Sequence, residues 1–158
     1  MSFLQIHEPG ETPLPHEGER AAAIGIDLGT TNTVVAISSD SKPEVVRGES
    51  GETLIPSVVA YAPDGTVVVG EVARRHLLDA PETVVSSIKR LMGRGVDDIK
   101  ALSGSLPYDI APANPGEGGM VRLAVSGRRL SPVEISADIL RAAKARAEAL
   151  GAHVAGSV

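Results

Sequence analysis

The stretch GIDLGTTN, residues 25–32, decides the fold of this chain because it joins two apolar runs through a turn. Residues 22–26 form a short run of small and β-branched residues, and residues 33–37 form a second one. Such runs are typical of buried strands. The residues between them, 27–32, have the composition of a turn, so the sequence predicts a β-hairpin.

The same turn carries groups that suit phosphate binding. Gly25 and Gly29 allow the backbone to approach a ligand closely, and successive amides in a tight turn can point at one anion. The hydroxyls of Thr30 and Thr31 add donors, and Asp27 at the strand end can orient a hydrated Mg²⁺ ion. On local composition alone an ordinary hairpin turn is the more common explanation, so the wider pattern has to decide.

Strand patterns continue through the first half of the chain and predict a β-meander. They lie at residues 44–47, 57–61 and 66–69, and prolines and glycines separate them. Helical spacing begins after Gly70 and predicts two short helices, over residues 71–78 and residues 84–92.

The second half combines an irregular segment with a long helix. Residues 95–130 are rich in glycine and proline, so we expect a peripheral insertion with a Gly-rich loop at 114–119 and a hairpin near Ser126. Ser131, Pro132 and Glu134 then supply an N-cap, a proline at the first helical position and a capping box. The helix is expected to run to Leu150, before Gly151. Its predicted apolar stripe is Ile135, Ile139, Ala142, Ala149 and Leu150, and its predicted polar stripe is Arg141, Lys144 and Glu148.

Composition limits the class of protein. With 158 residues, 42% of them apolar and 22% charged, the chain can form one packed domain or a piece of a larger one. Fifteen Lys and Arg against 20 Asp and Glu, with only three aromatic residues, argue against nucleic acid as a partner. Cysteine is absent, and no apolar run resembles an export signal or a membrane span, so we expect a cytoplasmic protein that does not bind membranes.

The two ends differ from the rest in composition. Residues 1–20 are acidic and rich in proline and glycine, which predicts a flexible arm. Residues 153–158 have the character of a connection that enters a new strand, so a truncated domain is expected.

Several motifs together resemble the seventy-kilodalton heat-shock (DnaK-type) chaperones, which belong to the actin and sugar-kinase ATPase superfamily. DLGTTN at 27–32 resembles the first phosphate loop of that family, and IPSVVAY at 55–61 resembles its second meander strand. SIKRLMGR at 87–94 resembles its lysine-bearing helix, and SADIL at 136–140 resembles a later helix. Leu4-Gln5-Ile6, the methionine in KRLMGR and Leu106-Pro107-Tyr108 resemble the HscA-like branch, which acts in iron–sulfur cluster assembly.

The resemblance implies a fold and a set of roles. The fold would be an incomplete α/β ribonuclease-H/actin-like ATPase lobe: a mixed sheet with a β-meander, flanked by helices, over residues 21–158, with a peripheral subdomain at about 57–130. Gly29, Thr30, Thr31 and Asn32 would hold the ATP phosphates, Asp27 would hold Mg²⁺ through water, and Lys89 would be catalytic. The implied ligands are ATP or ADP and Mg²⁺, with K⁺ as a further candidate. The implied partners are a J-domain co-chaperone and an iron–sulfur scaffold protein as client.

Other interpretations stay open at this point. Family members are much longer than this chain, which lacks the second half of the nucleotide cleft, so we expect the chain alone to be inactive or weakly active. Lys89 beside Arg90 and Arg94 is also what a solvated helix face looks like. The alternatives are a general DnaK-type folding chaperone, a sugar or acetate kinase of the same superfamily, and a non-catalytic interaction module.

Overall fold

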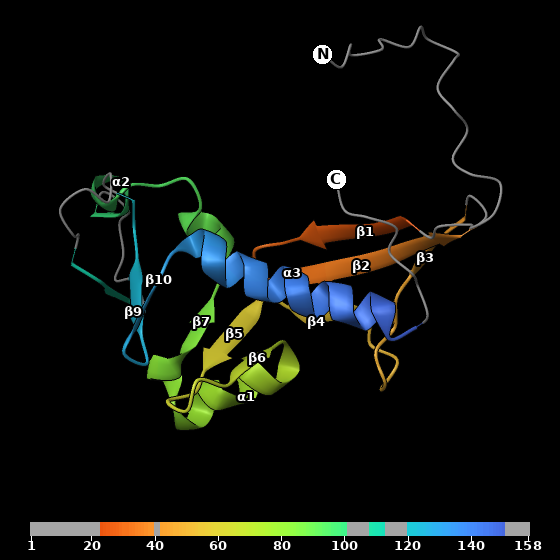
Figure 1. The fold of residues 1–158 in the computed structure, drawn as a ribbon, viewed down its shortest axis with the longest axis horizontal. Helices are drawn as coiled ribbons and strands as arrows, with labels where there is room; N and C mark the ends of the chain where they lie inside the picture. Colours follow the sequence, from red (N-terminus) through yellow and green to blue (C-terminus); the bar gives the residue numbers. More distant parts are fainter. Residues whose placement is uncertain (1–22, 40–41, 101–107, 113–119, 151–158) are drawn as a thin grey trace, which may run out of the picture.

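A computed structural model describes residues 23–39, 42–100, 108–112 and 120–150 of the chain. Its strands form three sheets, and one long helix, α3 (Pro132–Glu148), lies across two of them (Figure 1). Every strand pairing among these residues is antiparallel, so the expected mixed sheet is not found in this part of the chain. The predicted acidic arm, the Gly-rich loop at 114–119 and the strand-like tail lie outside the described residues.

The first sheet contains the predicted hairpin. β1 (Ala23–Leu28) and β2 (Asn32–Ser39) pair from Ala23 opposite Ser38 to Leu28 opposite Thr33. β3 (Lys42–Val45) and β4 (Leu54–Pro56) both pair with β2. The hairpin is therefore confirmed, with a shorter turn than the sequence predicts.

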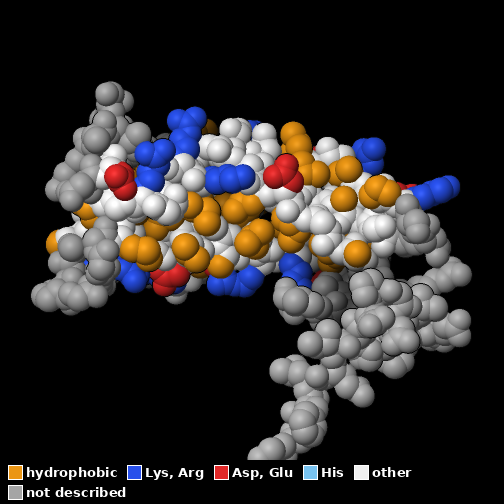
Figure 2. Space-filling model, turned by 90° about the horizontal axis from the view of Figure 1, so that it is seen from above, with side chains coloured by type: hydrophobic (Ala, Val, Ile, Leu, Met, Phe, Trp, Pro, Cys, Tyr) orange, Lys and Arg blue, Asp and Glu red, His pale blue; other side chains and the backbone are white. Residues whose placement is uncertain are grey.

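The two faces of this sheet have different surroundings. Ile24 and Ile26 of β1 lie on the face that packs against α3, where they contact a core cluster that includes Val35. On the opposite face, Val45 and Leu54 are each 47% exposed. Hydrophobic side chains also form a visible band on the surface in Figure 2.

The second sheet has the order β6-β5-β7, with β5 (Val58–Tyr61) between β6 (Val67–Val69) and β7 (Val84–Ser86). Val58 and Ala60 of β5 pack on Ala73 of α1 (Glu71–Asp79), while Val59 and Tyr61 face the main core. The predicted β-meander is found, but it is divided between two sheets, because the chain leaves the first sheet after Pro56 and enters the second at Val58. Ser57, between them, pairs in neither sheet and binds the β1–β2 turn instead.

The helix predicted over residues 84–92 is also wrong. Its first part is strand β7, and its second part is the 3₁₀ turn η2 (Ile88–Leu91), which follows a shorter 3₁₀ turn, η1 (Pro81–Thr83). Val84 and Val85 are β-branched and buried, and they pair with Ala60 and Val59 at the edge of β5. The same apolar spacing that suits a helix is used here by a strand followed by one tight turn.

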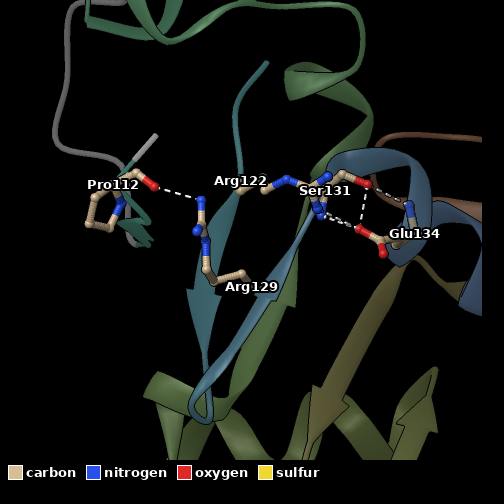
Figure 3. Close-up of polar contacts among 5 residues, drawn as sticks. All are labelled: Pro112, Arg122, Arg129, Ser131 and Glu134. Carbon is tan, nitrogen blue, oxygen red and sulfur yellow. Dashed lines mark hydrogen bonds and ion pairs between the residues drawn. The ribbon is translucent and has the colours of Figure 1, made fainter. Parts of the chain in front are cut away.

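The third sheet consists of β8 (Asp109–Ile110), β9 (Leu123–Val125) and β10 (Arg128–Leu130), and the short helix α2 (Val96–Lys100) precedes it. The predicted hairpin at Ser126 is confirmed: Ser126 and Gly127 have φ values of 47° and 72°. Arg129 of β10 donates a hydrogen bond of 2.6 Å to the carbonyl of Pro112, just after β8 (Figure 3). The segment expected to be peripheral also contributes Leu123 and Val125 to the main core.

The predicted start of α3 is confirmed in detail. The Ser131 hydroxyl accepts a hydrogen bond from the Glu134 amide at 3.2 Å, and the Glu134 carboxylate accepts one from the Ser131 amide at 2.7 Å (Figure 3). The amide of Ser131 is the main reason that the pKa of Glu134 lies below its ordinary value. The carboxylate also forms an ion pair of 3.3 Å with Arg122.

The apolar face of α3 differs from the predicted one. Ile135 and Ile139 are buried as expected, but Ala143 and Ala147 continue the buried row at four-residue spacing. Ala142 is only half-buried, and Ala149 and Leu150 are exposed beyond the end of the helix. The predicted polar stripe of Arg141, Lys144 and Glu148 is exposed.

α3 joins two cores. Its first half packs Ile135 and Ile139 against Val59, Leu123 and their neighbours. Its second half packs Ala143 and Ala147 against Val35, Val46 and Ile55, where the small alanines allow the helix to lie close to β2. The helix therefore fixes the hairpin of the first sheet relative to the second sheet (Figure 1).

Candidate functional site

The turn between β1 and β2 is closed by its own backbone. The Gly29 amide donates a hydrogen bond of 3.1 Å to the carbonyl of Asn32. A Cβ atom at position 29 would lie 2.2 Å from that carbonyl oxygen, which is closer than any side chain can approach. Glycine is therefore required at position 29 for this turn to form.

Two residues from distant parts of the chain hold the carbonyl groups of the turn. Ser57 donates from its hydroxyl to the Gly29 carbonyl at 2.9 Å and from its amide to the Thr31 carbonyl at 2.8 Å. The Lys89 ammonium group donates to the Leu28 carbonyl at 2.7 Å. The carbonyl oxygens of Leu28, Gly29 and Thr31 are thus all held by hydrogen bonds from residues outside the turn.

Ser57 is itself held in place by a second buried hydroxyl. Its Oγ lies 3.0 Å from Oγ1 of Thr33, and both side chains are almost completely buried. Because the Ser57 proton is used on the Gly29 carbonyl, Thr33 is the donor in this pair. The chain Thr33 to Ser57 to Gly29 satisfies every hydroxyl that the turn buries.

The amides of the turn have the opposite arrangement. Within the described residues, the backbone N–H groups of Thr30 and Thr31 donate to no protein acceptor. Unpaired amides in a tight turn form an anion-binding concavity, and a nearby ammonium group strengthens it. The carbonyl groups of Leu28, Gly29 and Thr31 are therefore used by other parts of the chain, whereas the Thr30 and Thr31 amides have no acceptor among the described residues.

Lys89 reaches this turn because of the short 3₁₀ segment that carries it. Ile88 and Leu91 of η2 are buried in the main core, whereas Lys89 and Arg90 are exposed. The amide of Arg90 donates to the Ser87 carbonyl at 3.1 Å and closes the turn. The structure thus brings Lys89 to the predicted phosphate loop, although it lies on a 3₁₀ turn and not on the predicted helix.

Asp27 lies in β1, one residue before Leu28. It is exposed and lies on the sheet face opposite the one that packs on α3. In the described parts of the chain no three acidic or histidine side chains gather at one point. A single carboxylate beside a turn with amides that lack an acceptor could suit Mg²⁺, which keeps several of its waters and uses few protein ligands. The donors of this site therefore fit a phosphate group with a hydrated Mg²⁺ ion.

Ser57 supports the turn from a distance of 28 positions in the chain, and the sequence does not indicate it as a site residue. Its role depends on the chain crossing from one sheet to the other, and a serine after a proline gives no such signal in isolation. Among the cavities lined by described residues, one of about 580 Å³ lies at the end of α3 beside Arg47 and Arg146, and none of the turn residues lines it.

Comparison with known proteins shows which family this chain matches. The family model described as Hsp70 protein matches residues 23–158. The chain is 46% identical over 159 aligned positions to a protein of Azotobacter vinelandii named "Chaperone protein HscA homolog". Proteins with the same name from Bordetella petrii and Laribacter hongkongensis are each 48% identical to it.

These alignments cover all of the present chain but only 24–25% of each relative. The chain therefore spans about a quarter of the length of the curated relatives that it matches. The β1–β2 turn, Ser57 and Lys89 all lie inside the matched residues.

Proposed function

The chain belongs to the Hsp70 family, and from that premise we propose that it is the first part of the nucleotide-binding domain of an ATP-dependent chaperone. The names of its relatives favour an HscA-type role in iron–sulfur cluster assembly. On this proposal residues 21–158 form part of a ribonuclease-H/actin-like ATPase lobe. The co-chaperone would be a J-domain protein, the client would be an iron–sulfur scaffold protein, and the location would be the cytoplasm.

The observation that carries the proposal is the meeting of Lys89 with the β1–β2 turn. The ammonium group lies 2.7 Å from the carbonyl of Leu28, and two and three residues further along the chain the amides of Thr30 and Thr31 have no acceptor in the described structure. A site of this kind suits phosphoryl transfer, which depends on positioning and charge compensation more than on covalent chemistry.

Each residue has a role that its position supports. The turn from Gly29 to Asn32 binds the phosphates through backbone donors. Lys89 orients the attacking water and offsets the negative charge that develops on the transferred group. Asp27 would hold a Mg²⁺ ion through water, and the chemistry that this ion would supply is neutralisation of phosphate charge.

The test measures ATP hydrolysis and nucleotide binding separately. The complete gene product should bind MgATP in a calorimetric titration and release phosphate, and J-domain protein should stimulate that release. The 158-residue chain should bind weakly and release little phosphate, because it spans only about a quarter of the length of its relatives. Release of ADP that depends on added sugar or acetate would contradict the chaperone proposal and support a kinase.

Among the described helices, none is long and apolar enough to cross a membrane.

A further inference from the structure

We propose that Tyr108 is a positioning residue for Lys89, acting through the backbone of Ser86 and Ser87. This inference rests on the proposed function for its effect on catalysis, while the contacts that support it are independent of any ligand. Tyr108 lies 19 positions after Lys89 in the sequence and directly before strand β8.

The Tyr108 hydroxyl binds both backbone groups of one residue. The Ser86 amide donates to it at 2.9 Å, and it donates in turn to the Ser86 carbonyl. The Ser86 hydroxyl is a further neighbour, at 3.0 Å. Because β7 lies at the edge of its sheet, one side of this strand has no strand partner in the described sheet. Tyr108 therefore takes the place of a strand partner at the last residue of β7.

The next residue has an unusual backbone. Ser87 has a φ of 54°, and only one other described residue besides glycine, Ser126, has a positive φ. A serine keeps this left-handed conformation only where both sides of it are held. On one side Tyr108 holds Ser86, and on the other the buried side chains of Ile88 and Leu91 hold η2.

This backbone reversal determines where Lys89 points. Only Ser87 and Ile88 separate Ser86 from Lys89, so a change of φ at Ser87 would swing the whole η2 turn. The Lys89 ammonium group depends on that direction to reach the Leu28 carbonyl at 2.7 Å. Among the described residues Tyr108 forms no hydrogen bond with the β1–β2 turn, and its hydroxyl binds Ser86 alone, so we expect its influence on Lys89 to pass through the backbone.

Tyr108 can hold Ser86 in place because contacts of its own neighbours and side chain fix its position. The neighbouring residue Asp109 pairs with Ala124 in the third sheet, and the Tyr108 side chain packs on the main core. Tyr108 thus connects the third sheet to the end of β7 and to the segment that carries Lys89.

The principal variant is Tyr108→Phe in the complete gene product, which removes only the hydroxyl. We expect kcat for ATP hydrolysis to fall about three- to tenfold, the range expected for loss of hydrogen bonds of this kind, while KM for ATP changes less than twofold. The matched control is Tyr61→Phe, which removes another partly satisfied core hydroxyl, bonded to Asp138 at 2.7 Å, and should leave kcat unchanged at a temperature where both variants are folded. Equal loss of kcat in the two variants would overturn the proposal, because it would indicate a general effect of stability.

Two further measurements separate this inference from the proposed function. Hydrogen exchange of a peptide covering residues 84–92 should speed up in Tyr108→Phe. The Ser86 amide loses its acceptor, and the hydrogen bond from the Arg90 amide to the Ser87 carbonyl becomes weaker. Unchanged exchange would overturn the inference even if the protein hydrolyses ATP. If the unaltered protein does not hydrolyse ATP, the proposed function fails, and the exchange result still decides whether Tyr108 holds this segment.

A second substitution tests the route through Ser87. Glycine adopts a φ of 54° without a side-chain penalty, so Ser87→Gly reduces the need for an external support. We expect the effect of Tyr108→Phe on kcat to be less than twofold in the Ser87→Gly background. A full three- to tenfold loss in that background would show that Tyr108 does not act through the backbone of Ser87.

Discussion

The side-chain ammonium group of Lys89 donates a 2.7 Å hydrogen bond to the backbone carbonyl of Leu28, 61 positions earlier in the chain. The partner is neutral, and no carboxylate in the described residues forms an ion pair with Lys89. The positive charge is therefore placed at the turn without being cancelled there. A phosphate group that binds to the turn could therefore form a charge-assisted hydrogen bond with the Lys89 ammonium group.

Substitution of Lys89 should separate hydrolysis from binding. In the complete gene product, Lys89→Ala is expected to lower the rate of phosphate release by about 100-fold, the usual effect of removing one group that stabilises developing charge. MgATP binding, measured by calorimetry, should weaken much less, because the turn amides remain. The control is Arg90→Ala, which removes an exposed neighbour on the same turn and should change the rate less than twofold. Comparable losses in both variants would indicate a general effect of surface charge.

The two glycines of the opening motif should respond differently to a methyl group. Gly29→Ala places a Cβ 2.2 Å from the Asn32 carbonyl, so the turn must change shape, at a cost of about 1–3 kcal/mol in the free energy of unfolding. Gly25→Ala meets nothing within 4 Å and should be neutral or slightly stabilising. Thermal melting of both variants of the 158-residue chain checks this. An equal loss of stability would show that the turn has no special need for glycine.

Ser57 should be more important for stability than an ordinary serine. Ser57→Ala removes the donor to the Gly29 carbonyl and leaves the buried Thr33 hydroxyl without its acceptor, which should cost about 1–3 kcal/mol. Adding Thr33→Val removes the stranded hydroxyl, so the double variant should be more stable than the sum of the two single effects predicts. Urea unfolding of the four proteins measures this coupling. Simple additivity would mean that the two hydroxyls act independently.

The capping box of α3 predicts a dependence of stability on pH. Hydrogen bonds from Ser131 lower the pKa of Glu134, so the folded state favours the ionised carboxylate. The stabilisation is complete above the ordinary pKa of about 4.5 and is lost as the pH falls through the lower folded-state pKa. Urea midpoints at pH 7 and pH 3 should therefore differ less in Glu134→Gln than in the unaltered chain.

Removal of the other half of the box gives an independent measure. Ser131→Ala should cost about 1 kcal/mol at pH 7, because the Glu134 amide loses its acceptor at the start of the helix. The neighbouring exposed residue Val133 offers a matched control, since Val133→Ala removes no cap contact. A cost for Val133→Ala equal to that of Ser131→Ala would contradict the assignment.

The features that could be predicted from the sequence are those that depend on neighbouring residues. The β1–β2 hairpin follows from residues 22–37, and the start of α3 follows from Ser131 to Glu134. Turn composition and cap chemistry act within a few residues, so their signals survive in any context.

The features that could not be predicted depend on distant partners. The apolar residues between Val84 and Met92 fit a helix and also fit a strand with a 3₁₀ turn. Pairing of residues 84–86 with β5, on the side that β6 leaves open, decides in favour of the strand. The predicted apolar stripe of α3 is wrong only beyond Ile139, because alanine fits either face of a helix. The face of α3 that is buried depends on its packing against the first sheet, where Ala143 and Ala147 lie in the same core cluster as Val35 of β2. For the site, the sequence could indicate Lys89 and the turn through a family resemblance, but the bond to Leu28 and the support from Ser57 require the folded chain.

The position of α3 across two cores has a consequence for cooperativity. If the first sheet separated, Ala143 and Ala147 would lose their contacts, and if the second separated, Ile135 and Ile139 would lose theirs. Neither sheet can unfold alone without exposing half of the buried face of one continuous helix. A ligand that binds the turn while contacting Lys89 would therefore stabilise both sheets together, as one unfolding unit.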